Sequence, residues 1–403
     1  MPSEADSDGL PRSQQVDWER IDTSGRLFSA ERYVLVAGLA ALGGLFAYDK
    51  YVADYFLVGQ WHVTRIHWAF LLGLVGLLAY GVVPAVRRRD FLRRVGQRLR
   101  DQPATLLAGG FLSTLLVVGI LGPMVVAKPG LSFQYAFHPP VGFTSEILPP
   151  DCVGRVTGEV FNRRCHGSWR FPLGTDMRGY PMSYQLAAGA RTAVYVLFIS
   201  GMFVVPVATG VGVIAGFRGG LIDDLLMSYV DIQLSIPAVI VYFVGFMYFG
   251  PSLLLLLVSF GLLSWGGIAR LVRSETLQRR EDGYVLVVRS LGASRSYIAR
   301  RHILPNITNT LIPAVFHLLA LFVLIEAGIA FLGFHDPLMR SWGSSISEAL
   351  NVVTLGPMPP SQWEAHKIWW VSTLPALALT ATLFSLKLLG DGLRDALDPR
   401  GGR

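Results

Sequence analysis

The chain has 403 residues, of which 52% are hydrophobic and only 16% are charged, and its mean hydropathy is +0.46. Soluble domains carry roughly 25% charged residues, so this composition excludes an ordinary soluble protein and indicates a membrane protein. The formal net charge of +7 would suggest a nucleic-acid partner in a soluble protein. Here the arginines lie in short loops beside apolar runs, so we expect contacts with membrane lipid and no nucleic-acid partner.

Eight apolar runs are long enough, or nearly so, to cross a bilayer as helices, which needs about 20 residues each. The first run is the shortest, because Asp49 and Lys50 end it. The sequence therefore predicts an all-α membrane protein, a polytopic helical bundle with about eight transmembrane helices. The expected spans are residues 30–48, 66–86, 104–127, 192–216, 226–249, 252–269, 307–331 and 368–389.

The distribution of arginine predicts the orientation of these spans. Seven arginines lie in residues 87–100, and eight lie in residues 270–301. Short arginine-rich loops stay in the cytoplasm. The two segments agree with each other, because an even number of expected spans separates them. We therefore expect a multi-pass protein of the cell membrane with both termini in the cytoplasm and with residues 128–191 and 332–367 outside.

The chain divides into three expected parts. Residues 1–100 hold an acidic cytoplasmic tail, a two-span hairpin and a basic cytoplasmic segment. Residues 101–191 hold one span and an external subdomain, and residues 192–403 hold a five-span core with a cytoplasmic loop (271–305) and a C-terminal tail. The start of the chain is acidic, unlike the basic start of a signal peptide, so we expect the first span to act as an uncleaved anchor.

The chain contains only two cysteines, Cys152 and Cys165, and both lie in the expected external subdomain. An outward-facing loop permits a disulfide between them, and two free thiols are the alternative.

Polar residues within the spans are candidates for the transport pathway or for gating, because a carboxylate in a membrane is costly. Asp231 and Glu326 are the acidic residues with the most apolar surroundings. The structural alternative is that Asp231 faces the bundle interior near the membrane edge, while Glu326 reaches the interface. Pro237 falls within an expected span, where either ordinary packing or a gating hinge explains it.

Motifs for catalysis and nucleotide binding are missing from the sequence. The chain has no Gly-Lys dipeptide, which a phosphate-binding P-loop requires, and no His-Glu-x-x-His or Gly-x-Ser-x-Gly pattern. The histidines show no clear metal spacing. We therefore expect no enzyme activity, no metal site and no cofactor on this chain. An intramembrane serine protease, the rival class, needs a Ser and a His at membrane depth, whereas Ser294 lies in an arginine-rich loop.

The segment 278–301 is polar, lies between two apolar runs and is expected to form one or two short helices. Its apolar residues Val285, Val288, Leu291 and Gly292 recur at a spacing of three to four, which indicates one apolar stripe. Gly292 can adopt a left-handed backbone and so end the first helix.

Ser294 is then the expected N-cap of the following helix, and Pro305 fits the first turn of the next span. Arg289 and Arg300 flank this amphipathic segment. Two interpretations fit the residues equally: the segment lies on anionic lipid, or it inserts into a groove on a cytosolic partner.

The same segment resembles the EAA loop of the membrane subunits of ABC importers. That pattern is Glu-Ala-Ala, three residues, Gly, about ten residues and Leu-Pro, and Gly292 and Leu304-Pro305 stand at this spacing. Further motifs, in the expected order and spread over well over half of the chain, resemble the C-type subunit of the dipeptide, oligopeptide and nickel permease family. These are Pro172-Leu-Gly-Thr-Asp176, Gly189-Ala-Arg-Thr192, Ile222-Asp223 through Asp231 to Pro237, Glu326-Ala, Phe331-Leu-Gly-Phe334, Ser341-Trp-Gly343 and Leu389 to Arg400.

Two features depart from the family pattern. Leu286-Val287-Val288 stands where the family has Glu-Ala-Ala, and the nearest acidic residues, Glu281 and Asp282, lie upstream. The first two spans have no counterpart in the usual six-span subunit. The lost Glu also leaves a non-transporting scaffold as a further alternative.

The resemblance implies a six-span type I importer permease core with two extra N-terminal spans. It implies that the chain forms half of a translocation pathway for dipeptides or oligopeptides, with nickel or another small solute as the alternative. The implied partners are a B-type permease subunit, two cytosolic ATPase subunits that carry ATP and Mg²⁺, and an external solute-binding protein.

The resemblance also assigns roles to residues. Leu291, Gly292, Ala293 and Ser294 would shape the elbow that docks on the ATPase. Arg289 and Arg300 would contact the ATPase or phospholipid. The external motif Gly174, Thr175 and Asp176 would lie near the binding protein, or serve as a structural turn.

Overall fold

The computed structural model describes residues 29–52, 63–87, 89–125, 129–146, 149–159, 162–355 and 365–397. Within these ranges, seven helices are long and apolar enough to cross a membrane, and one bent helix pair gives an eighth. The prediction of a polytopic helical bundle is confirmed. The acidic tail expected at the N-terminus lies outside the described residues.

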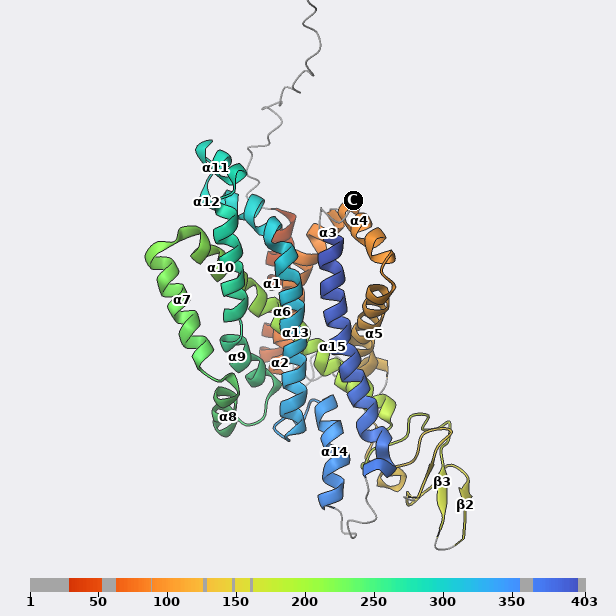
Figure 1. The fold of residues 1–403 in the computed structure, drawn as a ribbon. Coiled ribbons are helices and arrows are strands. Elements are labelled where there is room, and N and C mark those ends of the chain that lie inside the picture. The colour runs from red at the N-terminus through yellow and green to blue at the C-terminus, as the bar shows by residue number, and fades with distance from the viewer. Residues whose placement is uncertain are drawn as a thin grey trace, which may run out of the picture.

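The helices and strands are arranged as Figure 1 shows. Their bounds are α1 Ala30–Tyr51, α2 Arg65–Leu77, α3 Val83–Arg87, α4 Arg89–Arg100, α5 Pro103–Val125, β1 Thr144–Ser145, β2 Val156–Thr157, β3 Arg164–His166, α6 Met182–Arg218, α7 Gly220–Ser235, α8 Ala238–Phe249, α9 Leu253–Leu263, α10 Gly266–Arg280, α11 Gly283–Ser290, α12 Arg295–Ile298, α13 Leu304–Phe331, α14 Trp342–Leu355 and α15 Trp369–Leu397.

The bundle has two distinct ends (Figure 1). One end, the loop end, carries α11, α12, α4 and the C-terminal part of α15, and Arg98 donates a 2.8 Å hydrogen bond to the Ala396 carbonyl there. The opposite end, the subdomain end, carries α14 and a three-stranded antiparallel sheet in the order β1-β3-β2. Both arginine-rich segments therefore lie at the loop end, on the side opposite the cysteines.

The long helix α6 forms the centre of the bundle and packs against α10, α5, α13 and α2. Close contact with α10 depends on two of its glycines. A Cβ on Gly212 would lie 2.5 Å from the Ala269 carbonyl oxygen, and one on Gly216 would lie 2.8 Å from the Arg273 carbonyl oxygen. Small residues allow such close approach of helix backbones in membranes.

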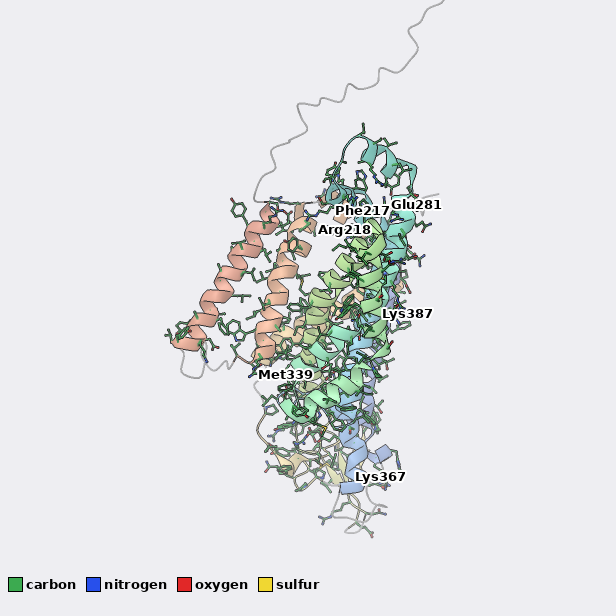
Figure 2. All side chains as sticks on the ribbon, turned by 90° about the vertical axis from the view of Figure 1, so that its left-hand side faces the viewer. Phe217, Arg218, Glu281, Met339, Lys367 and Lys387 are labelled. Atoms are coloured by element: carbon green, nitrogen blue, oxygen red, sulfur yellow. A yellow bond between two sulfur atoms is a disulfide. The ribbon has the colours of Figure 1, made fainter. Side chains whose placement is uncertain are left out.

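The two N-terminal helices differ in how they join the bundle. Helix α1 has no buried residue and lies outermost in Figure 2, whereas α2 packs directly on α6. Phe70 of α2 lies 5.4 Å from Phe198 between ring centroids, and His67 Nε2 lies 2.8 Å from Arg191 Nη2. The two N-terminal helices are thus attached to the rest of the bundle mainly through α2.

The span expected over residues 226–249 is broken. Helices α7 and α8 meet at an angle of 69°, and Pro237 is the N-cap of α8. A proline disfavours the helical conformation in the residue before it. Ile236 accordingly has an extended backbone, with φ −94° and ψ 118°. Pro237 therefore marks the bend between the two helices.

Candidate functional site

The loop between α10 and α13 folds as two short helices joined by a tight turn. Helix α11 ends in a turn in which Gly292 N–H donates to the Arg289 carbonyl at 3.0 Å and Ala293 N–H donates to the Val288 carbonyl at 3.3 Å. Gly292 has a φ of +85°, which glycine adopts without the cost that a Cβ brings. The turn predicted at Gly292 is present in the structure.

Ser294 starts the second half of the loop. Its Oγ accepts a hydrogen bond from the Tyr297 N–H at 3.3 Å, as expected for an N-cap. From Arg295 the backbone continues as one helical segment to Phe331, through a π-helical turn at Ala299–Ile303. Pro305 is exposed in the first turn of α13. A continuous helical segment therefore joins the loop to the subdomain end of the bundle.

The predicted apolar stripe of the loop is divided between two faces. Val285 is 2% exposed, and Val288 also packs against the bundle core. Leu291, however, is 80% exposed and lies on the other side. The expectation that these residues form one docking stripe is therefore wrong, because the bundle itself covers the half around Val285.

The outer face of the loop is apolar with a basic surround. Leu286 and Val287 are 51% and 58% exposed, and with Leu291 they form an uncovered apolar surface, which we call the outer loop face. Arg289 and Arg300 are exposed beside it. Figure 2 shows the neighbouring Glu281 at this end of the molecule, and its side chain is 76% exposed. Such a surface fits a groove with apolar walls and an acidic rim.

Two ion pairs connect α7 to α10. Asp231 pairs with Arg270, and both side chains are at least half exposed in the isolated chain. Asp223 accepts bonds of 2.5 and 2.6 Å from Arg273 and is 9% exposed at its side chain. The expectation that Asp231 faces the bundle interior is wrong. The buried acid on this helix is Asp223, whose partner lies 50 positions away in the sequence.

Glu326 lies at the junction of α13 and α14. Its carboxylate accepts a 3.0 Å hydrogen bond from Ser341 Oγ, and the residue is only 7% exposed. Ser341 Oγ in turn accepts from the Gly343 N–H at 3.2 Å. Glu326 is therefore buried within the protein, with Ser341 as its partner. It anchors the turn that starts α14.

The Ser341-Trp-Gly343 motif packs this turn onto α6. Trp342 Nε1 donates to the Leu186 carbonyl at 3.1 Å, and a Cβ on Gly189 would lie 2.2 Å from the Trp342 ring. A Cβ on Gly343 would lie 1.8 Å from the Ala327 carbonyl oxygen. Motifs far apart in the sequence thus meet at one junction, where α6, α13 and α14 are held together.

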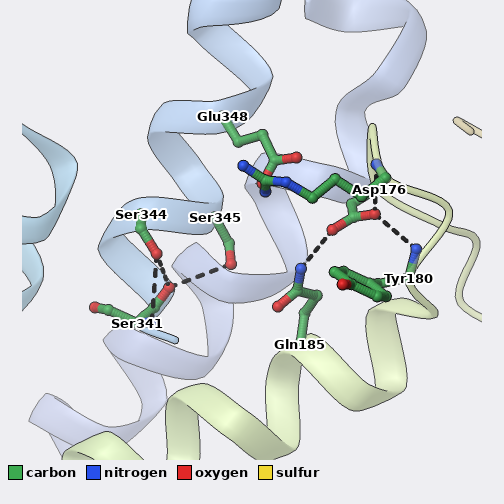
Figure 3. Close-up of polar contacts among 8 residues, drawn as sticks. Asp176, Tyr180, Gln185, Ser341, Ser344, Ser345 and Glu348 are labelled. Carbon is green, nitrogen blue, oxygen red and sulfur yellow. Dashed lines mark hydrogen bonds and ion pairs between the residues drawn. The ribbon is translucent and has the colours of Figure 1, made fainter. Parts of the chain in front are cut away.

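The external motif forms a second junction, between the subdomain and the first turns of α6 and α15. The Asp176 carboxylate accepts hydrogen bonds from the Tyr180 N–H at 2.7 Å and from Gln185 Nε2 at 2.5 Å (Figure 3). Trp370 Nε1 donates to the Thr175 carbonyl at 3.0 Å. Gly174 has a φ of +81° and leaves no room for a Cβ beside Trp370. The structure therefore places these residues in a buried turn.

Glu348 of α14 lies beside this turn (Figure 3). Arg178 Nη1 donates to its Oε2 at 3.2 Å. Burial raises the pKa of the Glu348 carboxyl to about 7, and the nearby Asp176 carboxylate adds to the rise, while Arg178 and Arg340 oppose it. Burial also raises the pKa of the Asp176 carboxyl. Burial therefore raises the pKa of two acidic groups at the subdomain end.

Cys152 and Cys165 are joined in a disulfide, with their Cα atoms 5.9 Å apart. Cys165 lies on the central strand β3, opposite Ser145 of β1 and Val156 of β2. The bond connects the loop before β2 to the small sheet, so the subdomain does not depend on its short strands alone.

Sequence reasoning missed several of these residues as site members. They are Asp223, Arg273, Gln185, Ser341 and Glu348. Asp223 and Ser341 stand inside motifs that were recognised, so the motifs were the available signal. The partners of these residues come from other helices, which no local spacing indicates.

Comparison with known proteins gives concordant matches. A family model described as "Binding-protein-dependent transport system inner membrane component" matches residues 208–402. The oligopeptide transport system permease protein OppC of Escherichia coli (strain K12) is 32% identical over 291 residues, which cover 72% of this chain and 86% of that protein.

Two further proteins are similar to this chain. The dipeptide transport system permease protein DppC of Bacillus subtilis (strain 168) is 29% identical over 57% of this chain and 68% of that protein. A solved structure of the methionine ABC transporter MetNI in inward-facing conformations matches with a TM-score of 0.43 and 20% identity, over 54% of this chain and 98% of that one.

Proposed function

We infer the function from one premise: the chain belongs to the family of binding-protein-dependent transport system inner membrane components, together with the oligopeptide and dipeptide permease proteins. It is a multi-pass membrane protein. We propose that it is the permease subunit of an ATP-driven ABC importer of dipeptides or oligopeptides. It forms half of the translocation pathway, a B-type permease subunit forms the other half, and an external solute-binding protein delivers the peptide.

The outer loop face is the observation that carries this proposal. Leu286, Val287 and Leu291 leave an apolar surface uncovered at the loop end, although the opposite side of the same helix is buried. A short helix that presents apolar side chains fits a groove on a partner. We propose that two cytosolic ATPase subunits bind this chain and its partner permease through such loops. ATP and Mg²⁺ bind to the ATPases, and this chain carries no cofactor for transport and catalyses no reaction.

Movement of the loop reaches the pathway through two helices. Helix α10 ends at Arg280 beside the loop, and the helical segment from Arg295 to Phe331 leaves its other side. Because helices move as rigid bodies, closure of the ATPases at the loop shifts both helices together and alternates access to the pathway. The bend at Pro237 and the exposed Asp231–Arg270 pair lie on the α7–α8 side, which we propose faces the pathway and the B-type subunit.

The orientation follows from charge. Both arginine-rich segments lie at the loop end, which supports a cytoplasmic position for this end and for both termini. The disulfide lies at the opposite end, which suits the oxidising exterior. The subdomain end would then face the solute-binding protein outside the cell membrane.

Co-purification from detergent tests the assembly. We expect the tagged chain to bring down a second permease and ATPase subunits. In the Leu291→Asp variant, we expect the second permease to remain and the ATPase subunits to be lost, since only the outer loop face is altered. Isolation of the unmodified chain without any ATPase subunit, under conditions that keep the two permeases together, would contradict the proposal.

A further inference from the structure

Three side chains with metal-binding atoms lie together at the subdomain end, away from the residues proposed for transport. His138, Cys152 and Cys165 each offer one such atom, and the three atoms lie within 4.8 Å of one another. They come from three different segments, namely the loop before β1, the loop before β2 and strand β3. Only folding brings them together.

Hydrogen bonds fix the backbone position and the protonated ring nitrogen of His138. Its backbone is held by two hydrogen bonds to Thr175, one of 2.8 Å from the His138 N–H to Thr175 Oγ1 and one of 3.0 Å from the Thr175 N–H to the His138 carbonyl. Its Nδ1 lies 3.0 Å from the Pro139 carbonyl oxygen, which can only accept a hydrogen bond, so Nδ1 carries the proton. Nε2 therefore presents its lone pair.

That lone pair accepts no hydrogen bond within the described part of the chain. His138 is 0% exposed, and Nε2 has no hydrogen-bond partner there. Histidine ligands of metals donate their other ring N–H to a carbonyl or carboxylate, and His138 donates to Pro139 in this way. His138 is thus a buried imidazole with one ring nitrogen that makes no hydrogen bond, and it lies in one cluster with two sulfur atoms. Imidazole nitrogen and thiolate sulfur are the donor types of a zinc site.

We propose that reduction of the Cys152–Cys165 disulfide creates a metal site at which His138 Nε2 and the two thiolates bind one thiophilic divalent cation such as Zn²⁺. Zinc accepts this combination of sulfur and nitrogen ligands, and three protein ligands leave a fourth position for water. The Cys165 backbone is held independently of the disulfide, since Cys165 is paired on both sides within the sheet.

The chemistry balances with an external dithiol as reductant. The dithiol transfers two electrons and two protons to the disulfide, becomes a disulfide itself and leaves two thiols on the chain. The cation then displaces the two thiol protons to the solvent and takes the imidazole lone pair without releasing a proton from it. The subdomain would keep a cross-link in either state, covalent when oxidised and metal-mediated when reduced.

Cobalt titration of the full chain in detergent, purified without a histidine tag, tests the proposal. Because the chain has only two cysteines, a thiolate-to-cobalt absorption band reports this site alone. We expect the reduced chain to bind one Co²⁺ with such a band, and the oxidised chain to show none. We expect His138→Gln to weaken binding at least tenfold. The matched control His166→Gln should bind as the unmodified chain does, since His166 Nε2 is already bonded to Thr157 Oγ1 at 2.8 Å.

Absence of the band in the reduced chain would overturn the proposal, and so would equal binding by His138→Gln and His166→Gln. A second measurement covers a variant that fails to fold. In the reduced unmodified chain, Zn²⁺ should protect both thiols from alkylation by iodoacetamide, and Mg²⁺ should not. Equal alkylation rates with and without Zn²⁺ would also refute the site.

Discussion

Val285 and Leu291 lie six residues apart on the same loop and face opposite ways, with exposed fractions of 2% and 80%. The bundle covers Val285, while Leu291 projects from the loop end. The loop is therefore anchored on one side and open on the other. This division gives each residue a different expected effect on stability and on assembly.

Replacing Leu291 with Asp should weaken binding of the ATPase subunits by about tenfold, on the order of 1.4 kcal/mol, with little change in thermal stability. Val285→Asp should instead lower the melting temperature, because it buries a carboxylate without a partner. Binding is measured on immobilised permease, and unfolding is measured by tryptophan fluorescence. Equal ATPase binding by Leu291→Asp and the unmodified chain would remove the outer loop face from the proposed interface.

Gly292 should tolerate asparagine better than alanine. Its φ of +85° strains a residue with a Cβ by about 1–2 kcal/mol, and asparagine adopts this region more readily. Steric overlap does not disfavour these substitutions, because a Cβ at Gly292 would meet nothing within 4 Å. We expect ATP hydrolysis stimulated by substrate-loaded binding protein to fall in the order Gly292, Gly292→Asn, Gly292→Ala. Gly283→Ala, also without steric neighbours, serves as the control. An alanine variant as active as the original would refute the role of the turn.

Gly343→Ala should destabilise the junction of α13 and α14 by at least about 3 kcal/mol, because the added Cβ would overlap the Ala327 carbonyl. Gly328→Ala is its matched control. Gly328 lies next to Ala327 in α13, where a Cβ meets nothing within 4 Å, and this change should stabilise the helix by about 0.5–1 kcal/mol. Melting temperatures in the same detergent compare the two. Similar values would show that α14 does not pack on α13 as described.

The stability of the subdomain end should depend on pH through Glu348. Its folded pKa of about 7 exceeds the ordinary value of 4.5, so the folded chain binds more protons than the unfolded chain between these values. The contribution of Glu348 to stability is therefore full below about pH 4.5 and is lost as the pH rises to about 7.

Melting temperatures at pH 5 and pH 8 test this dependence. The Glu348→Gln variant should lose less stability between the two pH values than the unmodified chain, because glutamine does not ionise. The Asp176 carboxyl, whose pKa is also raised, keeps part of the dependence in both. An identical decline in the variant would mean that Glu348 does not titrate in this range.

Local features of the sequence predicted local structure well. The helix end at Gly292 and the N-cap at Ser294 depend on backbone preferences within a few residues, and both are present. The apolar runs predicted the helical bundle for the same reason, since a spanning helix satisfies its own backbone hydrogen bonds.

Features that depend on which helices meet were harder to predict. Residue spacing predicted one common stripe for Val285 and Leu291, because spacing indicates which residues share a helix face but not what covers that face. The sequence did not indicate the burial of Glu326, because its partner Ser341 lies in the turn before α14 and not on the same helix. The metal-binding atoms of His138, Cys152 and Cys165 show no sequence spacing typical of a metal site, because three separate segments contribute them.

Uptake by proteoliposomes tests the central claim most directly. Vesicles would contain this chain, its partner permease and the ATPase subunits, with ATP on the ATPase side and peptide-loaded binding protein on the other. The account predicts ATP-dependent accumulation of labelled peptide that is lost when this chain is omitted and reduced in the Leu291→Asp variant. ATP hydrolysis by the complete complex without uptake of any peptide, or uptake that Leu291→Asp leaves unchanged, would contradict it.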